Sequence, residues 1–102
     1  MNQQNPLSLF RNQLIIKMNL QIEIPDYSPN DGFKYEWCKD FQIKTSFERN
    51  VFVIKANKEG LISLAKQLLQ LAQDDVPNGY HLHYDEFNCL ENGSPDFVIE
   101  KG

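Results

Sequence analysis

The sequence predicts a single α+β domain, in which one amphipathic helix packs on one face of a mainly antiparallel sheet of about five or six strands. Several stretches alternate apolar and polar residues with period two, and one stretch repeats leucine at helical spacing. Short, turn-rich segments join these stretches, which favours antiparallel pairing over long crossovers. A chain of 102 residues has room for one core, so we expect one domain.

The first expected strand follows a stretch with little periodicity. Residues 1–17 are rich in Asn and Gln, and we expect a poorly packed N-terminal arm ahead of a domain over 18–102. From Met18 to Ile24 apolar and polar residues alternate, which is typical of a half-buried strand. Whether Met18 is the natural start stays open.

Aromatic residues dominate the expected middle strands. After a loop of turn-forming residues over 25–32, odd-numbered aromatics indicate a core beneath the helix: Phe33, Tyr35, Trp37, Phe41 and Phe47. Lys39-Asp40 interrupts this pattern as a turn, a bulge or an edge position. Glu48-Arg49-Asn50 is a plausible hairpin turn, and the apolar run Val51–Ile54 suits a central strand.

The helix is expected over about residues 58–73. Asn57 is its predicted N-cap, and Glu59 in the first turn is favoured by the helix dipole. Gly60 in that turn suggests a close backbone contact. Apolar side chains recur at near-3.6 spacing and predict the buried face (Leu61, Leu64, Ala65, Leu68, Leu69, Leu71 and Ala72), while Ser63, Lys66, Gln67, Gln70 and Gln73 fall mostly opposite.

Two further strands are expected after the helix. The Val76-Pro77-Asn78-Gly79 turn ends the helix, and residues 80–84 alternate as a strand. Asn92-Gly93 is a turn signal, and a short strand follows over 97–99. These elements complete the expected sheet.

Composition limits the classes of function. The formal net charge of -4 argues against nucleic-acid binding, which depends on Lys and Arg contacts to phosphate. No apolar run approaches the roughly 20 residues of a membrane span, and no secretory signal is evident. Cys38 and Cys89 are too few for a disulfide scaffold, so we expect a cytoplasmic protein with reduced thiols.

One strand carries residues with possible chemistry. Period two places His81, His83 and Asp85 on one face, a pattern that can supply two nitrogen ligands and one oxygen ligand to zinc, with Cys89 as another candidate. This metal-binding interpretation competes with that of a polar strand face, because the chain has only two histidines. No common nucleophile, phosphate-loop or zinc-protease motif is present, so we expect no enzyme and no cofactor.

The acidic residues suggest a basic partner. Residues 59–102 carry a net charge of -6, against +2 for residues 1–58. Asp74 and Asp75 either oppose the dipole at the helix C-terminus or lie beyond it in the loop. Glu86 and Glu91 fall in the expected connection between the last two strands. A one-sided negative field can steer a basic protein, although a plain solvated surface explains the same pattern.

A family resemblance combines these features. The segment Ile54–Leu61, read as I-K-A-N-K-E-G-L, is followed by Leu64-Ala65, by the alternating Gly79-x-His81-x-His83-x-Asp85 and by Phe97-Val98-Ile99. Over about residues 54–100 the chain resembles small α+β immunity proteins found beside bacterial polymorphic toxins.

The resemblance implies neutralisation of a cognate toxin by stoichiometric binding. We predict that a basic toxin domain contacts the acidic loops and the polar strand face, through Asp74, Asp75, His81, His83, Asp85, Glu86 and Glu91. Alternatives left open are a small metal-binding protein centred on His81, His83 and Asp85, and a homodimer formed through the open sheet face.

Overall fold

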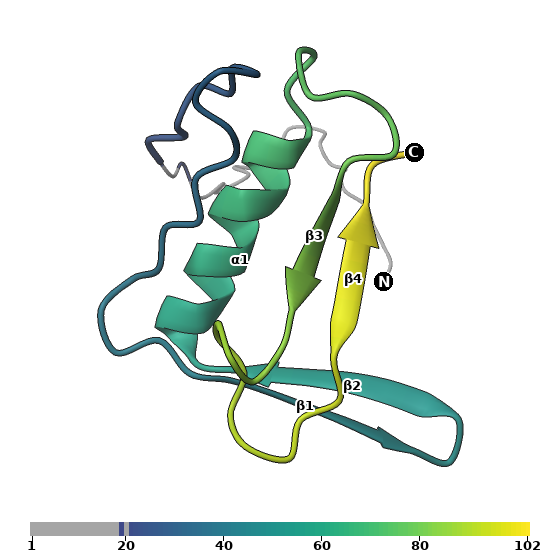
Figure 1. Ribbon diagram of the computed structural model, residues 1–102. Helices are drawn as coiled ribbons and strands as arrows, with labels where there is room; N and C mark the ends of the chain where they lie inside the picture. Colours follow the sequence, from purple (N-terminus) through teal and green to yellow (C-terminus); the bar gives the residue numbers. More distant parts are fainter. Residues whose placement is uncertain (1–18, 20) are drawn as a thin grey trace, which may run out of the picture.

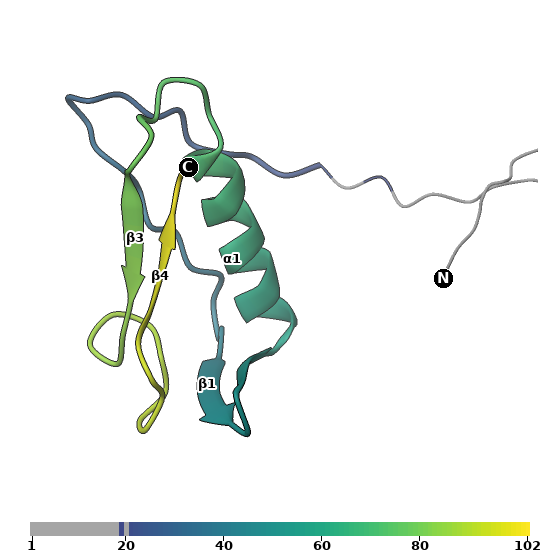
Figure 2. The same cartoon turned by 90° about the vertical axis from the view of Figure 1, so that its right-hand side faces the viewer.

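The computed structural model describes residue 19 and residues 21–102, and its fold is α+β with four strands and one helix in that part of the chain. The order is β1 (Ile43–Glu48), β2 (Val51–Ala56), α1 (Lys58–Leu71), β3 (His81–Tyr84) and β4 (Phe97–Glu100). The strands form two separate antiparallel pairs, β1–β2 and β3–β4 (Figure 1). α1 lies along one side of the β3–β4 pair (Figure 2).

The prediction of five or six strands in one sheet is therefore wrong. The expected strand from residue 18 begins outside the described residues, and its described part, residues 19 and 21–24, contains no strand. Residues 33–37 are also not in a strand, although their odd-even pattern predicted one. The predicted arm over 1–17 lies wholly outside the described residues.

The described segment before β1 pairs with no strand, and side chains of α1 and of the residues just after it bond its backbone instead. The Gln70 side chain accepts a hydrogen bond from Lys34 N at 3.0 Å and donates one to Lys34 O at 2.8 Å. Gln73, just beyond the helix, bonds Tyr27 N and Pro25 O in the same way. Four backbone polar groups of the segment are thus satisfied by glutamine side chains, as those of a strand are by a neighbouring strand.

Two more polar side chains extend this contact toward the helix N-terminus. Ser63 Oγ accepts from Cys38 N at 2.8 Å, and Gln67 Nε2 donates to Glu36 O at 3.2 Å. Gln67 Oε1 also accepts the Tyr84 hydroxyl at 2.8 Å. Ser63, Gln67 and Gln70 are all at most 1% exposed, so the polar face of α1 faces inward.

The expected burial of the leucine face is wrong for four of its seven members, three leucines and Ala72, all of which are exposed. Leu61, Leu68 and Leu69 are 56%, 43% and 51% exposed, while Leu64 is partly buried and Leu71 is buried. The helix rotates toward the segment over 25–38 because its glutamines bond that backbone. With the leucine face turned inward instead, the backbone groups of Lys34 and Glu36 would lose these hydrogen-bond partners.

The helix start agrees with the sequence. Asn57 Oδ1 accepts from Gly60 N at 2.8 Å and from Gln42 N at 3.0 Å, so the residue caps α1 and holds the chain before β1. A Cβ on Gly60 would lie 2.6 Å from Gln42 O, which confirms the expected close contact. α1 ends at Leu71, two residues before the predicted end.

The core lies between α1, β3 and the start of β1. Its buried apolar residues are Ile43, Leu71, Val76, Leu82, Tyr84 and Leu90. Tyr84 is fully buried and stacks on Phe97 with ring centroids 4.6 Å apart. Of the predicted aromatic core, Phe33, Trp37 and Phe41 pack against this cluster. Tyr35 and Phe47 do not belong to it, being 43% and 60% exposed.

The β1–β2 hairpin forms at the predicted turn but does not contain a central strand. Arg49 and Asn50 have φ values of 54° and 63°, as a two-residue type I′ turn requires. Val51–Ile54 were expected to be buried, yet their exposed fractions range from 40% to 56%. The reason is topological: β2 pairs only with β1 and forms the outer edge of a two-stranded sheet.

The last two strands and their turns follow the prediction. β3 and β4 pair antiparallel, with His81 opposite Glu100 and Tyr84 opposite Phe97. Gly79 and Gly93, in the two predicted turns, have φ of 89° and 84°. In the described part of the chain, no helix combines the length and apolar character that a membrane crossing needs.

Substitutions that exchange a polar and an apolar side chain on α1 test which face of the helix is buried. Gln70→Leu leaves Lys34 N–H and C=O without their partners and should lower the free energy of unfolding by about 1–3 kcal/mol. The matched variant Leu69→Gln changes an exposed position and should stay within about 0.5 kcal/mol of wild type. Urea unfolding measures both, and a costly Leu69→Gln beside a neutral Gln70→Leu would show the leucine face buried after all.

Candidate functional site

The predicted acidic residues lie at opposite ends of the domain. α1 runs from the β1–β2 hairpin to the far end of the molecule, where Asp74 and Asp75 follow it (Figure 1). β3 runs back, so the connection over 85–96, with Glu86 and Glu91, lies beside the hairpin. One rigid partner surface would have to span the length of α1 to contact both groups.

Asp74 and Asp75 are exposed and lie beyond the last helical turn. They therefore belong to the loop, and the conflict with the helix dipole does not arise. A cation that the sequence reasoning missed reaches this loop from the residue after β4. The Lys101 ammonium donates to Gln73 O at 2.6 Å and to Val76 O at 2.8 Å, which satisfies carbonyls after the helix.

Asp85 and Glu86 hold the connection between β3 and β4 in shape. Asp85 Oδ1 accepts from Phe87 N at 2.9 Å and Asn88 N at 3.0 Å, while Glu86 Oε2 accepts from Gly93 N at 2.7 Å. Both carboxylates thus have structural roles within the loop. Glu91 is exposed, and its own backbone N donates to Ile43 O at 2.9 Å, which fixes the loop against β1.

This ordered loop presents an aromatic side chain to solvent. Phe87 is 98% exposed, although its backbone N–H is held by Asp85. An aromatic side chain gains nothing from such exposure in the free protein, and aromatic residues often anchor protein interfaces. The sequence reasoning did not select Phe87. The sequence did hold a signal for its exposure, because Phe87 directly follows Asp85 and Glu86 and precedes Asn88, in a polar loop.

The two histidines share the outer face of β3, as period two predicted. Their rings lie 4.9 Å apart between centroids at 71°, and His81 Nδ1 is 2.9 Å from Gly79 O. Asp85 does not join them, because its carboxylate bonds the following loop. Among the described residues, no group of three or more His, Cys, Asp or Glu side chains is placed to hold a metal ion.

Cys89 is poorly suited to nucleophilic chemistry. Burial raises the pKa of its thiol to about 11, and the nearby Asp85 charge adds to that effect. A thiol with this pKa is almost wholly protonated at neutral pH, whereas the thiolate is the reactive form. The residue packs at the edge of the apolar core.

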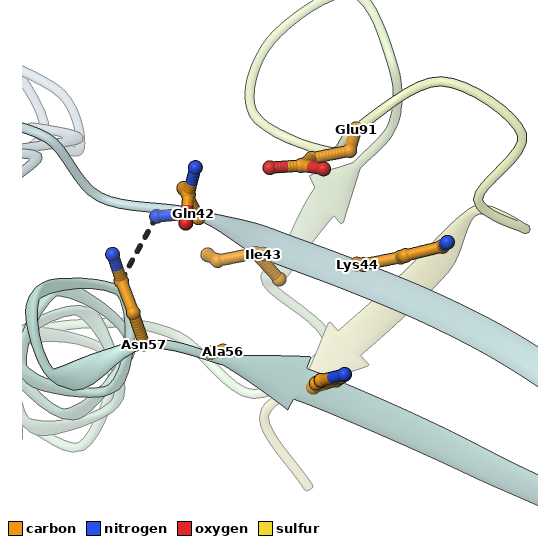
Figure 3. Close-up of a pocket in the computed structure, with 7 residues that line it drawn as sticks. Gln42, Ile43, Lys44, Ala56, Asn57 and Glu91 are labelled. Carbon is orange, nitrogen blue, oxygen red and sulfur yellow. Dashed lines mark hydrogen bonds between the residues drawn. The ribbon is translucent and has the colours of Figure 1, made fainter.

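A groove beside the hairpin brings together residues that the sequence analysis did not combine. It has a volume of about 270 Å³ and is lined by Gln42, Ile43, Lys44, Lys55, Ala56, Asn57 and Glu91 (Figure 3). The Glu91 carboxylate points toward Gln42, and the Lys44 ammonium points the opposite way. Only Glu91 of this group was predicted.

Lys44 and Lys55 are direct partners across the two strands of the hairpin. The signal for this pairing was present in the sequence. A two-residue turn at Arg49-Asn50 pairs Glu48 with Val51 and, counting outward, Lys44 with Lys55. Like charges directly opposite one another destabilise a strand pair, so the two lysines do not contribute to the stability of the hairpin.

Comparison with known proteins identifies the class as an immunity protein. The sequence model of the family described as Immunity protein 32 matches residues 51–102, which is half of the chain and includes every element from β2 onward. The chain belongs to the Immunity protein 32 family. No curated protein and no solved structure gives a significant match.

The reactivity of Cys89 provides a test of its environment. In a Cys38→Ser variant at pH 8, iodoacetamide should modify the folded protein at least roughly tenfold more slowly than the protein in concentrated urea, because the raised pKa keeps the thiol protonated. The rate should rise as pH approaches 11. Equal folded and unfolded rates at pH 8 would show an accessible, ordinary thiol.

Proposed function

We propose that this protein neutralises a cognate bacterial toxin by forming a stoichiometric protein–protein complex with it, without chemistry of its own. Membership of the Immunity protein 32 family carries this proposal. The exposed Phe87, held out by an ordered loop, supports it, because such a residue suits a role in binding. A cytoplasmic location and a homodimer through the open sheet face stay predictions.

Within the proposal, the toxin contacts the end of the domain formed by the loop over 85–96. There Phe87 provides an apolar anchor, and the exposed Glu86 and Glu91 provide negative charge for a basic toxin surface. His83, at the β3 end that leads into this loop, and Asp85 complete this side of the site. Asp74, Asp75 and His81, predicted from the sequence, lie toward or at the opposite end of the domain and form the alternative contact area.

Co-expression tests the function directly. We expect this chain to restore the growth of cells that express the toxin domain encoded beside its gene, and to co-purify with that domain in a 1:1 complex. The association rate should fall as salt rises, because screening weakens the attraction between acidic and basic surfaces. A harmless neighbour, or two proteins that never associate, would refute the proposal.

Charge and anchor variants distinguish the two ends. Phe87→Ala and Glu91→Lys should each weaken the toxin complex by about tenfold or more, with little change in melting temperature, because both side chains are exposed. The double variant Asp74→Lys/Asp75→Lys is the matched control at the other end and should bind within about threefold of wild type. Titration calorimetry measures all three, and the reverse pattern would place the toxin at the helix end.

A further inference from the structure

The outer edge of β2 has backbone groups with no neighbour strand. Across a type I′ turn, Glu48 and Val51 form a hydrogen-bonded pair, and such pairs alternate along the ladder. The bond from Asn57 N to Gln42 O at 3.1 Å continues the same alternation. Val51, Val53 and Lys55 therefore bond β1, whereas the N–H and C=O groups of Phe52 and Ile54 point away from it.

The other edge of the hairpin is already covered. Glu91 N donates to Ile43 O at 2.9 Å, and Thr45 N donates to Ser94 Oγ at 3.1 Å. The loop over 91–95 thus occupies the free edge of β1. Across residues 21–102, no backbone hydrogen bond outside the hairpin involves Phe52 or Ile54, so β2 is its open edge.

This open edge lacks the usual protection against pairing. Exposed edge strands in native proteins are commonly short, charged, bulged or interrupted by proline. β2 has six residues in regular register, and four consecutive apolar side chains, Val51 to Ile54, are 40–56% exposed. Lys55 is its only charged residue.

The charge at this edge indicates what kind of strand it would accept. Lys44 and Lys55 lie side by side on one face of the hairpin. Neither forms an ion pair, because within the described residues the only ion pair joins Lys66 of α1 to Glu36. Two adjacent ammonium groups that repel each other attract a carboxylate on the next strand of the same face.

We propose that β2 binds an extended segment of the cognate toxin as a third strand of the hairpin sheet, with an acidic side chain of that segment beside Lys44 and Lys55. This inference rests on the proposed function and specifies its contact. Main-chain bonds to Phe52 and Ile54 supply affinity, and apolar contacts with Val51 and Val53 together with the lysine pair supply specificity. Glu91, in the loop that also carries Phe87, lines the same groove as Lys44 and Lys55, so the two contact areas adjoin there.

A second copy of this chain fits the edge less well. Antiparallel pairing of β2 with itself would place both lysine pairs on one face and, at full overlap, set Lys55 opposite Val51 of the second copy, so that no carboxylate would lie directly beside either pair. Glu48, at the far end of β1, is the only carboxylate that each hairpin adds to that face. Charge therefore favours a partner strand with carboxylates over self-pairing.

Hydrogen exchange of single amides, read by NMR, tests the strand contact without any mutation. In the free protein the amides of Phe52 and Ile54 should exchange quickly, and those of Val53 and Lys55 slowly. An inactive form of the neighbouring toxin domain should slow exchange at Phe52 and Ile54 by at least about tenfold, since those amides become donors to a new strand. Unchanged exchange there in a complex that does form would overturn the inference.

Matched variants test the same contact by affinity. Val53→Lys adds a charge to the edge face and should weaken toxin binding about tenfold or more, whereas Val98→Lys, at a similarly exposed valine on β4, should leave affinity within about threefold. Lys55→Glu should weaken binding although it turns the repelling pair into an attractive one and keeps or raises the melting temperature. Lys34→Glu makes the same change of charge near the C-terminal end of α1 and is the control for Lys55→Glu.

The outcomes separate this inference from the proposed function. If wild type fails to bind the toxin domain at all, the proposed function fails. If wild type binds while Val53→Lys and Lys55→Glu bind equally well, only the β2 contact is refuted. If sedimentation shows a dimer and the amides of Phe52 and Ile54 are protected without toxin, the occupant is a second copy and the inference is wrong.

Discussion

The fold depends on a set of hydrogen bonds between the polar face of α1 and an extended segment that belongs to no sheet. Ser63, Gln67, Gln70 and Gln73 bond the backbone at intervals from residue 25 to residue 38. Each amide can donate and accept at once, so Gln70 satisfies both backbone groups of Lys34 and Gln73 bonds two residues of the segment. These bonds determine which face of α1 is buried, and most of the unusual surface follows from that choice.

Exposed apolar surface is the main consequence of this arrangement. Because α1 turns its glutamines inward, Leu61, Leu68 and Leu69 face solvent; Val51 to Ile54 are exposed as well, since β2 pairs only with β1. Apolar side chains that find no place in the core lie on α1, on β2 and at Phe87. A protein that acts by binding gains from such a surface, since the area is available for burial against its partner.

Local features of the fold were predictable from the sequence, and the pairing of distant segments was not. The Asn57 cap, the turn at Arg49-Asn50 and the alternation of His81–Tyr84 each depend on a few neighbouring residues. Periodicity gave the wrong element at Phe33–Trp37 and the wrong buried face on α1. The sequence does not distinguish a glutamine that bonds a distant backbone from a glutamine that faces water. The acidic residues were identified as candidates from the sequence. That they lie at two opposite ends of the domain became visible only from the directions in which α1 and β3 run.

The position of the lysine pair suggests how charge is divided on this surface. The chain is acidic overall, yet Lys44 and Lys55 lie on the exposed face of the hairpin, beside a loop that presents Glu91. A partner that matches this end must carry basic groups opposite the loop and acidic groups opposite the hairpin. Mixed charge of this kind fixes the orientation of the partner more strongly than a uniform acidic patch, because a rotated or shifted partner would bring like charges together.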